Sequence, residues 1–205
     1  MDWERALQSV PELRSLPHEL RDAAKCRTLD AREYLFRLGV RPRAVFCLLN
    51  GEVRLVRQGR DGTEVVLQRC DGGFLAEASM DAARYHCDAL VTETADLLSF
   101  PIAAFQQALD THPGFREAWI SRLAGEVRRL RAQAERLCLN SARDRVIHYI
   151  ESEGKNGAIH LRHSRKAWAQ ELGLSHEALY RTLSRLQREG VLVVDGTQIR
   201  LTPTT

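Results

Sequence analysis

The sequence lacks the features that mark membrane, secreted and fibrous proteins. No apolar run in its 205 residues approaches the ~20 residues that a membrane-spanning helix needs. The N-terminal stretch carries acidic residues early and contains no apolar segment, so we expect no secretory signal. The chain has only 5 cysteines, an odd number in a chain too long to need a disulfide framework. This favours free thiols and a reducing cytoplasm.

The sequence also lacks the short motifs of common catalytic sites. It contains no Gly-x-Ser-x-Gly elbow, no His-Glu-x-x-His pair and no glycine-rich loop that could cradle a phosphate. We therefore do not expect an enzyme. Hydrophobic residues make up 44% of the chain and charged residues 28%, the balance of an ordinary globular protein.

A strong excess of one charge is absent as well, because the net charge is only +3. The charge is unevenly distributed, however. Residues 1–110 carry a net charge of −3, whereas residues 111–140 and 141–205 each carry +3. The C-terminal half is therefore the better candidate for a surface that binds a polyanion.

Short β-type runs separated by turn signals dominate the first half of the chain. The turn signals are Asn50-Gly51 and the glycine-containing stretches at 59–62 and 71–73. The expected strands cover residues 44–49, 53–57, 64–68, 89–91 and 97–100. This spacing predicts an antiparallel roll or barrel rather than a parallel sheet with crossover helices.

A short amphipathic helix is expected over residues 102–109, and a longer helix follows it. Apolar or small residues recur along this second helix at spacings of 3 and 4, at Ile120, Leu123, Val127, Leu130, Ala134 and Leu137. This is the a/d pattern of a coiled coil. We expect a partner helix along this seam, most simply from the second subunit of a homodimer. A helix packed only on its own domain is the alternative.

The last third of the chain has clear signals for two helices joined by a tight turn. One helix is expected from the cap Ser164 to Leu172 and another from the cap Ser175 to Glu189. Gly173 provides the turn between them.

A hairpin is expected after these helices, with runs at 191–194 and 198–201 on either side of Asp195-Gly196. Helix, tight turn, helix and hairpin together predict a winged helix-turn-helix within residues 141–205. The predicted partner of such a domain is double-stranded DNA. A basic surface helix without a ligand is the alternative.

The second of these helices carries side chains suited to base edges near its N-terminus. Arg181 can donate two hydrogen bonds to guanine, and Glu177 can accept one from cytosine. A recognition helix presents this end to the major groove. Phosphate contacts are expected from Ser164, Arg165, Lys166 and Arg185, and the remaining predicted DNA contacts are Ser175, His176 and Tyr180.

Three segments carry a family pattern. The first is Ser175-His176-Glu177-Ala178-Leu179-Tyr180-Arg181, and the other two are Gly51-Glu52-Val53-Arg54-Leu55 and Gly72-Gly73-Phe74-Leu75-Ala76-Glu77. With them the chain resembles the Crp/Fnr family of bacterial transcription regulators over roughly residues 20–202. That family's recognition segment reads Ser-Arg-Glu-Thr-hydrophobic-x-Arg, and Glu177 and Arg181 match its base-reading Glu and Arg.

The resemblance implies an α+β protein in three parts. Residues 1–110 would form a cyclic-nucleotide-binding-type β-roll that senses an effector. Residues 111–140 would form the dimerisation helix, and residues 141–205 the winged helix-turn-helix. Two such domains in a dimer would bind the half-sites of a pseudo-palindromic operator. RNA polymerase is a candidate further partner.

The resemblance also implies an effector pocket, with Glu77, Ala78, Ser79, Tyr85, His86, Cys87, Leu130 and Arg131 as candidate lining residues. Members that bind cyclic AMP use an Arg followed by Ser or Thr to hold the cyclic phosphate, and these two positions are Tyr85 and His86 here. A buried phosphate without a cationic partner would be poorly compensated, so we do not expect cyclic AMP.

The effector is therefore unknown, and the residues leave several signals open. His86 and Cys87 could bind Cu(I) or Zn(II), Cys87 could sense oxidation, and haem is a third option. Adjacent strand residues point to opposite faces, so a further metal ligand would have to come from Cys26, Cys70, Cys138 or the other subunit.

The alternatives involve neither a metal nor a reactive thiol. Cys87 could simply pack in the core, which is the usual role of a free cysteine. The protein could then be a constitutive DNA-binding dimer with a degenerate pocket, or it could respond to a small organic or nucleotide ligand.

Overall fold

The computed structural model describes residues 3–161 and 164–203 of the chain. The chain divides into two compact units, Met1–Ile120 and Ser121–Thr205. The division falls inside one long helix, α4 (Pro113–Cys138). Within the described residues, no helix combines the length and the apolar character that crossing a bilayer requires.

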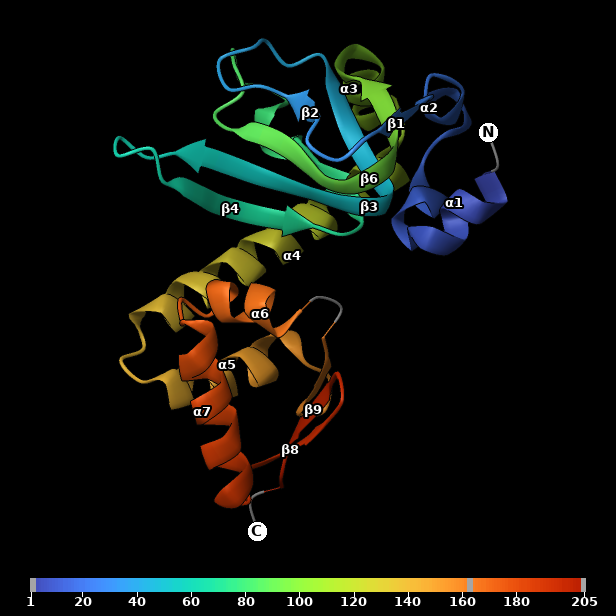
Figure 1. Cartoon of the computed structure of the whole chain (residues 1–205). Helices are drawn as coiled ribbons and strands as arrows, with labels where there is room; N and C mark the ends of the chain where they lie inside the picture. The colour runs from blue at the N-terminus through green and yellow to red at the C-terminus, as the bar shows by residue number, and fades with distance from the viewer. Residues whose placement is uncertain (1–2, 162–163, 204–205) are drawn as a thin grey trace. The chain divides into compact units, whose positions relative to one another are not determined.

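The first unit is an antiparallel β-roll preceded by short helices (Figure 1). The helices are α1 (Trp3–Ser9), the 3-10 helix η1 (Pro11–Ser15) and α2 (His18–Asp22). The strands are β1 (Lys25–Leu29), β2 (Tyr34–Phe36), β3 (Ala44–Gln58), β4 (Glu64–Cys70), β5 (Gly73–Leu75) and β6 (Asp88–Pro101). They follow the order β1-β6-β3-β4, with β2 paired to β6 and β5 to β3. These pairings are all antiparallel, which confirms the predicted roll.

Alternation along the strands builds the core of the roll. On β6 the side chains of Ala89, Val91 and Ala95 are buried, and the other residues between Ala89 and Ala95 are half-buried or exposed. Val53 on the neighbouring β3 and Leu75 on β5 are buried in the same core. Burial of one face of each strand fixes the register of the sheet, because a slip by one residue would expose this set.

β3 is one strand of 15 residues, so the turn expected at Asn50-Gly51 is wrong. The pairing of β3 with β6 shifts register around this dipeptide, which marks a β-bulge. Gly51 has φ +89 there, and a Cβ on it would lie 2.3 Å from the carbonyl oxygen of Thr94. The dipeptide thus bends the strand without reversing it. β6 is continuous too, so the separate strands expected at 89–91 and 97–100 belong to one element.

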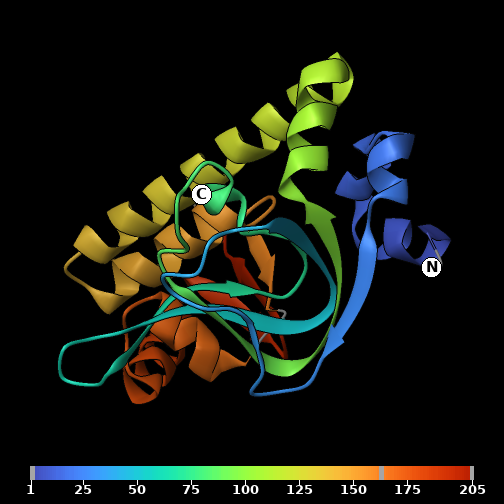
Figure 2. The same ribbon diagram turned by 90° about the horizontal axis from the view of Figure 1, so that it is seen from above.

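Aromatic side chains attach the start of α4 to the first unit. β6 runs directly into α3 (Ile102–Thr111) (Figure 2). The ring of Phe105 on α3 lies 5.3 Å from that of Phe115 and 4.8 Å from that of Trp119, both on α4. Phe74 on β5 contacts Trp119 edge-on at 5.1 Å. Such edge-to-face pairs stabilise packing beyond the area they bury.

The coiled-coil seam predicted along α4 is exposed in the single chain. Ile120, Val127, Leu130 and Leu137 are between 46% and 58% exposed. A row of exposed aliphatic side chains on one helix is typical of an interaction surface.

The second unit is a winged helix-turn-helix, as predicted. After α4 it contains α5 (Ala142–Glu153), β7 (Ala158–His160), α6 (Arg165–Glu171), α7 (His176–Arg188), β8 (Leu192–Asp195) and β9 (Gln198–Leu201). The strands form an antiparallel sheet in the order β7-β9-β8. The core of the unit is centred on Trp168 of α6, which is fully buried among aliphatic side chains of α5, α7 and the wing.

The bulge in β3 generates a stability prediction. We expect Gly51→Ala to destabilise the protein by about 3 kcal/mol or more, because the new Cβ adds a clash with Thr94 to the strain of a positive φ. Gly62→Ala is the control. Gly62 has φ +80 and open space around it, so that variant should cost only about 1–2 kcal/mol of strain. Urea unfolding measures both values, and equal losses would contradict the close approach.

Candidate functional site

The helix-turn-helix rests on two serine caps and one glycine turn. The Ser164 hydroxyl accepts a hydrogen bond from the backbone N–H of Ala167 at the start of α6. The Ser175 hydroxyl accepts one from Ala178 at the start of α7. Gly173 between the helices has φ +63, a conformation that glycine adopts without strain. These contacts fix where α7 begins.

α7 buries one face and exposes the other. Leu179, Leu183 and Leu186 are at most 3% exposed and join the core of the second unit. On the opposite face the predicted DNA contacts are exposed; these are His176, Glu177, Tyr180, Arg181 and Arg185. Within the described part of the chain, Arg181 has no hydrogen bond or ion pair, so its guanidinium is available to a ligand.

Tyr180 and Arg165 connect α7 to α6 and to the wing. The guanidinium of Arg165 lies 5.3 Å from the centre of the Tyr180 ring, and the centre of the His176 ring lies 4.5 Å from the same point. Arg165 also donates a hydrogen bond from Nη2 to the carbonyl of Gly196 in the wing turn, at 3.0 Å. Arg165, expected to contact phosphate, thus uses one donor to hold the wing. Lys166 beside it is exposed.

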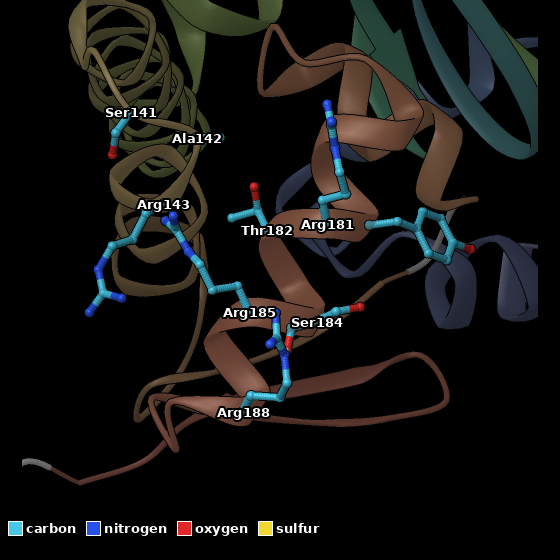
Figure 3. Close-up of a pocket in the computed structure, with 9 residues that line it drawn as sticks. Ser141, Ala142, Arg143, Arg181, Thr182, Ser184, Arg185 and Arg188 are labelled. Carbon is cyan, nitrogen blue, oxygen red and sulfur yellow. The ribbon is translucent and has the colours of Figure 1, made fainter.

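A basic groove of about 650 Å³ lies between the start of α5 and the exposed face of α7 (Figure 3). Four arginines line it, Arg143 from α5 and Arg181, Arg185 and Arg188 from α7. The other lining residues are Ser141, Ala142, Tyr180, Thr182 and Ser184. Guanidinium groups gathered in this way suit a ligand with repeated negative charges.

The groove has one internal counter-ion and one helix N-terminus. Glu189 forms ion pairs with Arg143 and with Arg185, the latter at 3.7 Å. At the start of α5, the Ser141 hydroxyl accepts from the backbone N–H of Asp144 and donates to its carboxylate. The dipole of this helix adds positive potential at its N-terminus, where a phosphate is favoured.

Sequence reasoning missed Ser141, Arg143 and Arg188 as candidate ligand contacts. Arg143 and its partner Glu189 are 46 residues apart in the chain, so no local pattern places them together. The spacing of Ser141 and Asp144 is an N-cap signal that would have located the start of α5.

In the roll, the predicted pocket residue Tyr85 is packed into the core. It is 4% exposed, and its ring stacks on Phe36 with centroids 3.8 Å apart and planes 12° apart. Phe36 lies 6.1 Å from Phe46 in turn. The Tyr85 backbone bonds to Gly39 and Val40. Burial raises the pKa of the phenol, which keeps the ring neutral, and a tyrosine has no cationic form that could pair with a phosphate.

His86 and Cys87 do not converge on one point. Cys87 is 1% exposed within the core of the roll, whereas His86 is exposed with Nδ1 3.5 Å from the hydroxyl of Ser79. Burial raises the pKa of the Cys87 thiol, and the neighbouring Asp88 raises it further. The thiol is therefore protonated at neutral pH, unlike a metal-binding or redox-active thiolate.

The other candidate metal ligands are scattered. Cys70 is buried, whereas Cys26 and Cys138 are exposed. Across residues 3–161 and 164–203, no three His, Cys, Asp or Glu side chains form a group suited to a metal ion. A metal site here stays a prediction that requires ligands from a second chain.

The other predicted pocket residues lie in two places. Glu77, Ala78 and Ser79 form the 3-10 helix η2 (Glu77–Ser79), which follows Ala76 in a left-handed conformation with φ +70. Leu130 and Arg131 lie on the part of α4 that belongs to the second unit, and both are exposed.

Comparison with known proteins agrees with both halves of this description. Residues 26–112 match the family model of the cyclic nucleotide-binding domain, and residues 134–203 match that of the Crp-like helix-turn-helix domain. The chain belongs to the Crp/Fnr family. As a Crp/Fnr-family protein it is a DNA-binding transcription regulator and not an enzyme.

Solved structures of Crp/Fnr regulators share the fold over nearly the whole chain. DNR from Pseudomonas aeruginosa is 25% identical, with a TM-score of 0.55, over 98% of this chain and 94% of that one. The Thermus thermophilus Catabolite Activator Protein is 22% identical, with a TM-score of 0.52, over 94% and 93%. FixK2 from Bradyrhizobium japonicum is 21% identical, with a TM-score of 0.65, over 88% and 93%. No curated protein sequence gives a significant match.

The cysteine environments of this Crp/Fnr regulator generate a reactivity prediction. With a thiol reagent at pH 7, the exposed Cys26 and Cys138 should react fast, and Cys87 should react slowly because it is buried and protonated. Its rate should rise only at a pH more alkaline than for an ordinary cysteine. Mass spectrometry of the labelled peptides measures each rate. Labelling of Cys87 as fast as of Cys26 would instead favour a thiol sensor.

Proposed function

We propose that this Crp/Fnr regulator binds a pseudo-palindromic operator as a homodimer, with α7 of each subunit in the major groove. The observation that carries the proposal is the pairing of an exposed, polar α7 face with the arginine-lined groove beside it. The face offers groups that distinguish bases, and the groove offers cations for the phosphates that flank them.

The two kinds of contact fall on different side chains. Arg181 and Glu177, near the N-terminus of α7, are the base-reading candidates, with Tyr180 and His176 beside them. Arg143, Arg185 and Arg188 lie further along the groove and are the phosphate candidates, together with Lys166 and Ser164. Base contacts select the sequence, whereas phosphate contacts set the register of the protein on DNA.

The exposed seam of α4 supports the homodimer. Two copies of this stripe would form the a/d core of a parallel pair of helices and remove its aliphatic side chains from water. A twofold dimer then presents two α7 helices to half-sites about 34 Å apart, one turn of DNA. Such a protein would act in the cytoplasm of a bacterium, where its DNA lies, and would affect transcription by promoting or hindering RNA polymerase.

For the roll, we propose that DNA binding does not require a cyclic nucleotide. Tyr85 stands where the family resemblance expects the phosphate-binding Arg, and its ring is stacked on Phe36 inside the core. This supports a degenerate pocket and a constitutive DNA-binding dimer. A metal ion or haem bound through His86 is the second candidate, supported by the exposure of the imidazole, whereas oxidation of Cys87 would require its buried thiol to become accessible.

Selection from a random duplex library tests the proposal. The full chain, purified under reducing conditions, is incubated with the library, and the bound duplexes are sequenced. Recovery of two inverted half-sites at a constant spacing is the expected result, and recovery without any sequence preference would overturn it.

A second experiment tests the signal. Affinity for the selected duplex is compared in apo, oxidised, Zn(II)-, Cu(I)- and haem-loaded samples and with cyclic AMP. Equal affinities favour the constitutive dimer, and a change with one addition identifies the signal.

Two arginine variants separate base reading from phosphate binding. Arg181→Ala should cost about 1–3 kcal/mol on the selected duplex and relax the preference at one position of each half-site. Arg188→Ala should weaken binding to all sequences alike and reduce the salt slope by about 1 for each subunit. Fluorescence anisotropy over a range of salt concentrations measures both effects. A uniform loss for Arg181→Ala would remove it from the base-reading set.

The seam generates a prediction about assembly. Val127→Glu should convert the dimer to a monomer at micromolar concentration, because it would bury two like charges in the helix pair. Arg129→Gln, on the outer side of the same helix, should stay dimeric. Analytical ultracentrifugation distinguishes the species, and a dimeric Val127→Glu protein would locate the interface elsewhere.

A further inference from the structure

One arginine of α4 is buried where the helix meets the DNA-binding domain. Arg136 is 2% exposed, although it stands two residues before the end of α4. It donates from Nη2 to the carboxylate of Glu153 and to the hydroxyl of Ser152, both at 3.0 Å. Its guanidinium also lies 4.5 Å from the centre of the Tyr149 ring. All three partners belong to the second half of α5, so Arg136 binds the C-terminal end of that helix.

The contacts continue from α5 into the helix-turn-helix. Tyr149 donates a hydrogen bond from its hydroxyl to Glu171 of α6 at 3.2 Å, and its ring packs edge-on against Trp168 at 5.5 Å. Trp168 is fully buried in the core that also holds Leu179 and Leu183 of α7. An unbroken series of contacts therefore leads from Arg136 to the recognition helix.

A second arginine holds the other end of α5. Arg145, in the first turn of α5, donates to the carbonyl of Leu137 in the last turn of α4 at 3.4 Å and to that of Leu139, just after α4, at 2.8 Å. It also donates to the carbonyls of Leu172 and Gly173 at the helix-turn-helix turn. In the middle of α5, His148 pairs with Glu135 of α4 at 3.3 Å. Arg136 is the link at the C-terminal end of α5, so it contributes to the direction in which the 12-residue helix leaves α4.

Directional bonds add to packing in setting this direction. A buried guanidinium is costly to desolvate, and a whole buried ion pair can often be replaced by apolar residues without loss of stability, whereas removal of one partner alone is destabilising. Arg136 differs from an apolar residue in its directional bonds to Ser152 and Glu153, which hold α5 in one orientation. Loss of these bonds should therefore change the orientation of α5 as well as lower the stability of the unit.

We propose that Arg136 is a positioning residue that sets the angle between α4 and the helix-turn-helix, and thereby the half-site spacing that the dimer selects. The inference rests on the proposed dimeric DNA binding. The two α4 helices pair at the centre of the proposed dimer. A change in the angle between α4 and α5 in each subunit therefore changes the distance between the two α7 helices, or their relative rotation about the DNA axis. One base pair of spacing rotates a half-site by about 35°.

The test is selection from a random duplex library with the full-length wild type and Arg136→Met. Methionine replaces the apolar stem of the arginine but forms no hydrogen bond, so we expect a folded dimer with a lower unfolding temperature, because Glu153 loses its partner. The recovered half-site should be unchanged, but its spacing should be broader or shifted. The affinity ratio between the wild-type spacing and spacings one base pair longer or shorter should fall toward one. Arg136→Lys keeps the charge but has fewer donors, so its affinity ratio should lie between those of the wild type and Arg136→Met.

Arg129→Met is the matched control. Arg129 stands one heptad before Arg136, at the same position relative to the seam, but it is 43% exposed and pairs with Glu126 of its own helix. The Arg129→Met protein should therefore select the same half-site spacing as the wild type. If Arg136→Met does not fold, Glu153→Ala removes the same ion pair from the α5 side and should broaden the spacing in its place.

The possible results separate this inference from the function it rests on. A wild type that recovers no paired half-sites overturns both. Paired half-sites with the same sharp spacing in the wild type and in folded Arg136→Met or Glu153→Ala overturn the positioning role alone. A variant that loses affinity equally at every spacing also overturns it, because such a loss reflects weakened folding or dimerisation.

Discussion

The structure of the DNA-binding unit depends on the burial of one face of α7. Leu179, Leu183 and Leu186 are removed from water against the core around Trp168, and each such side chain stabilises the fold by roughly 1.5–3 kcal/mol. Because this face must point inward, the polar face must point outward. The exposure of Arg181, the position of the groove and the attachment of the wing all follow from that orientation.

Sequence reasoning succeeded where structure is encoded locally. The caps Ser164 and Ser175 and the wing hairpin lie where the residue patterns predict them, because each depends on neighbours a few residues away. It failed at Asn50-Gly51, where a sequence that usually reverses the chain forms a bulge instead. The pairing of β3 with β6 decides that outcome, and a local pattern contains no information about a strand 40 or so residues later.

The functional residues divide in the same way. The base-reading candidates stand in one continuous segment and were found from it, whereas Arg143 reaches the groove only because α5 packs beside α7. For the roll, the sequence placed Tyr85, His86 and Cys87 together, but in the irregular segment before β6 the side chains of Tyr85 and Cys87 are buried and that of His86 is exposed. The histidine and the cysteine suggested a metal or haem site there. Burial decides which of these side chains an ion or a cofactor could reach, and only His86 is exposed.

The two ion pairs of Glu189 have a consequence for selectivity. This carboxylate already neutralises part of the charge of Arg143 and Arg185, so an anion that binds between them has to displace an internal competitor. A single small anion gains little from that exchange. Under the proposed function, a duplex that also forms base contacts along α7 gains more from that exchange, so the ion pairs of Glu189 favour the matched sequence over other polyanions.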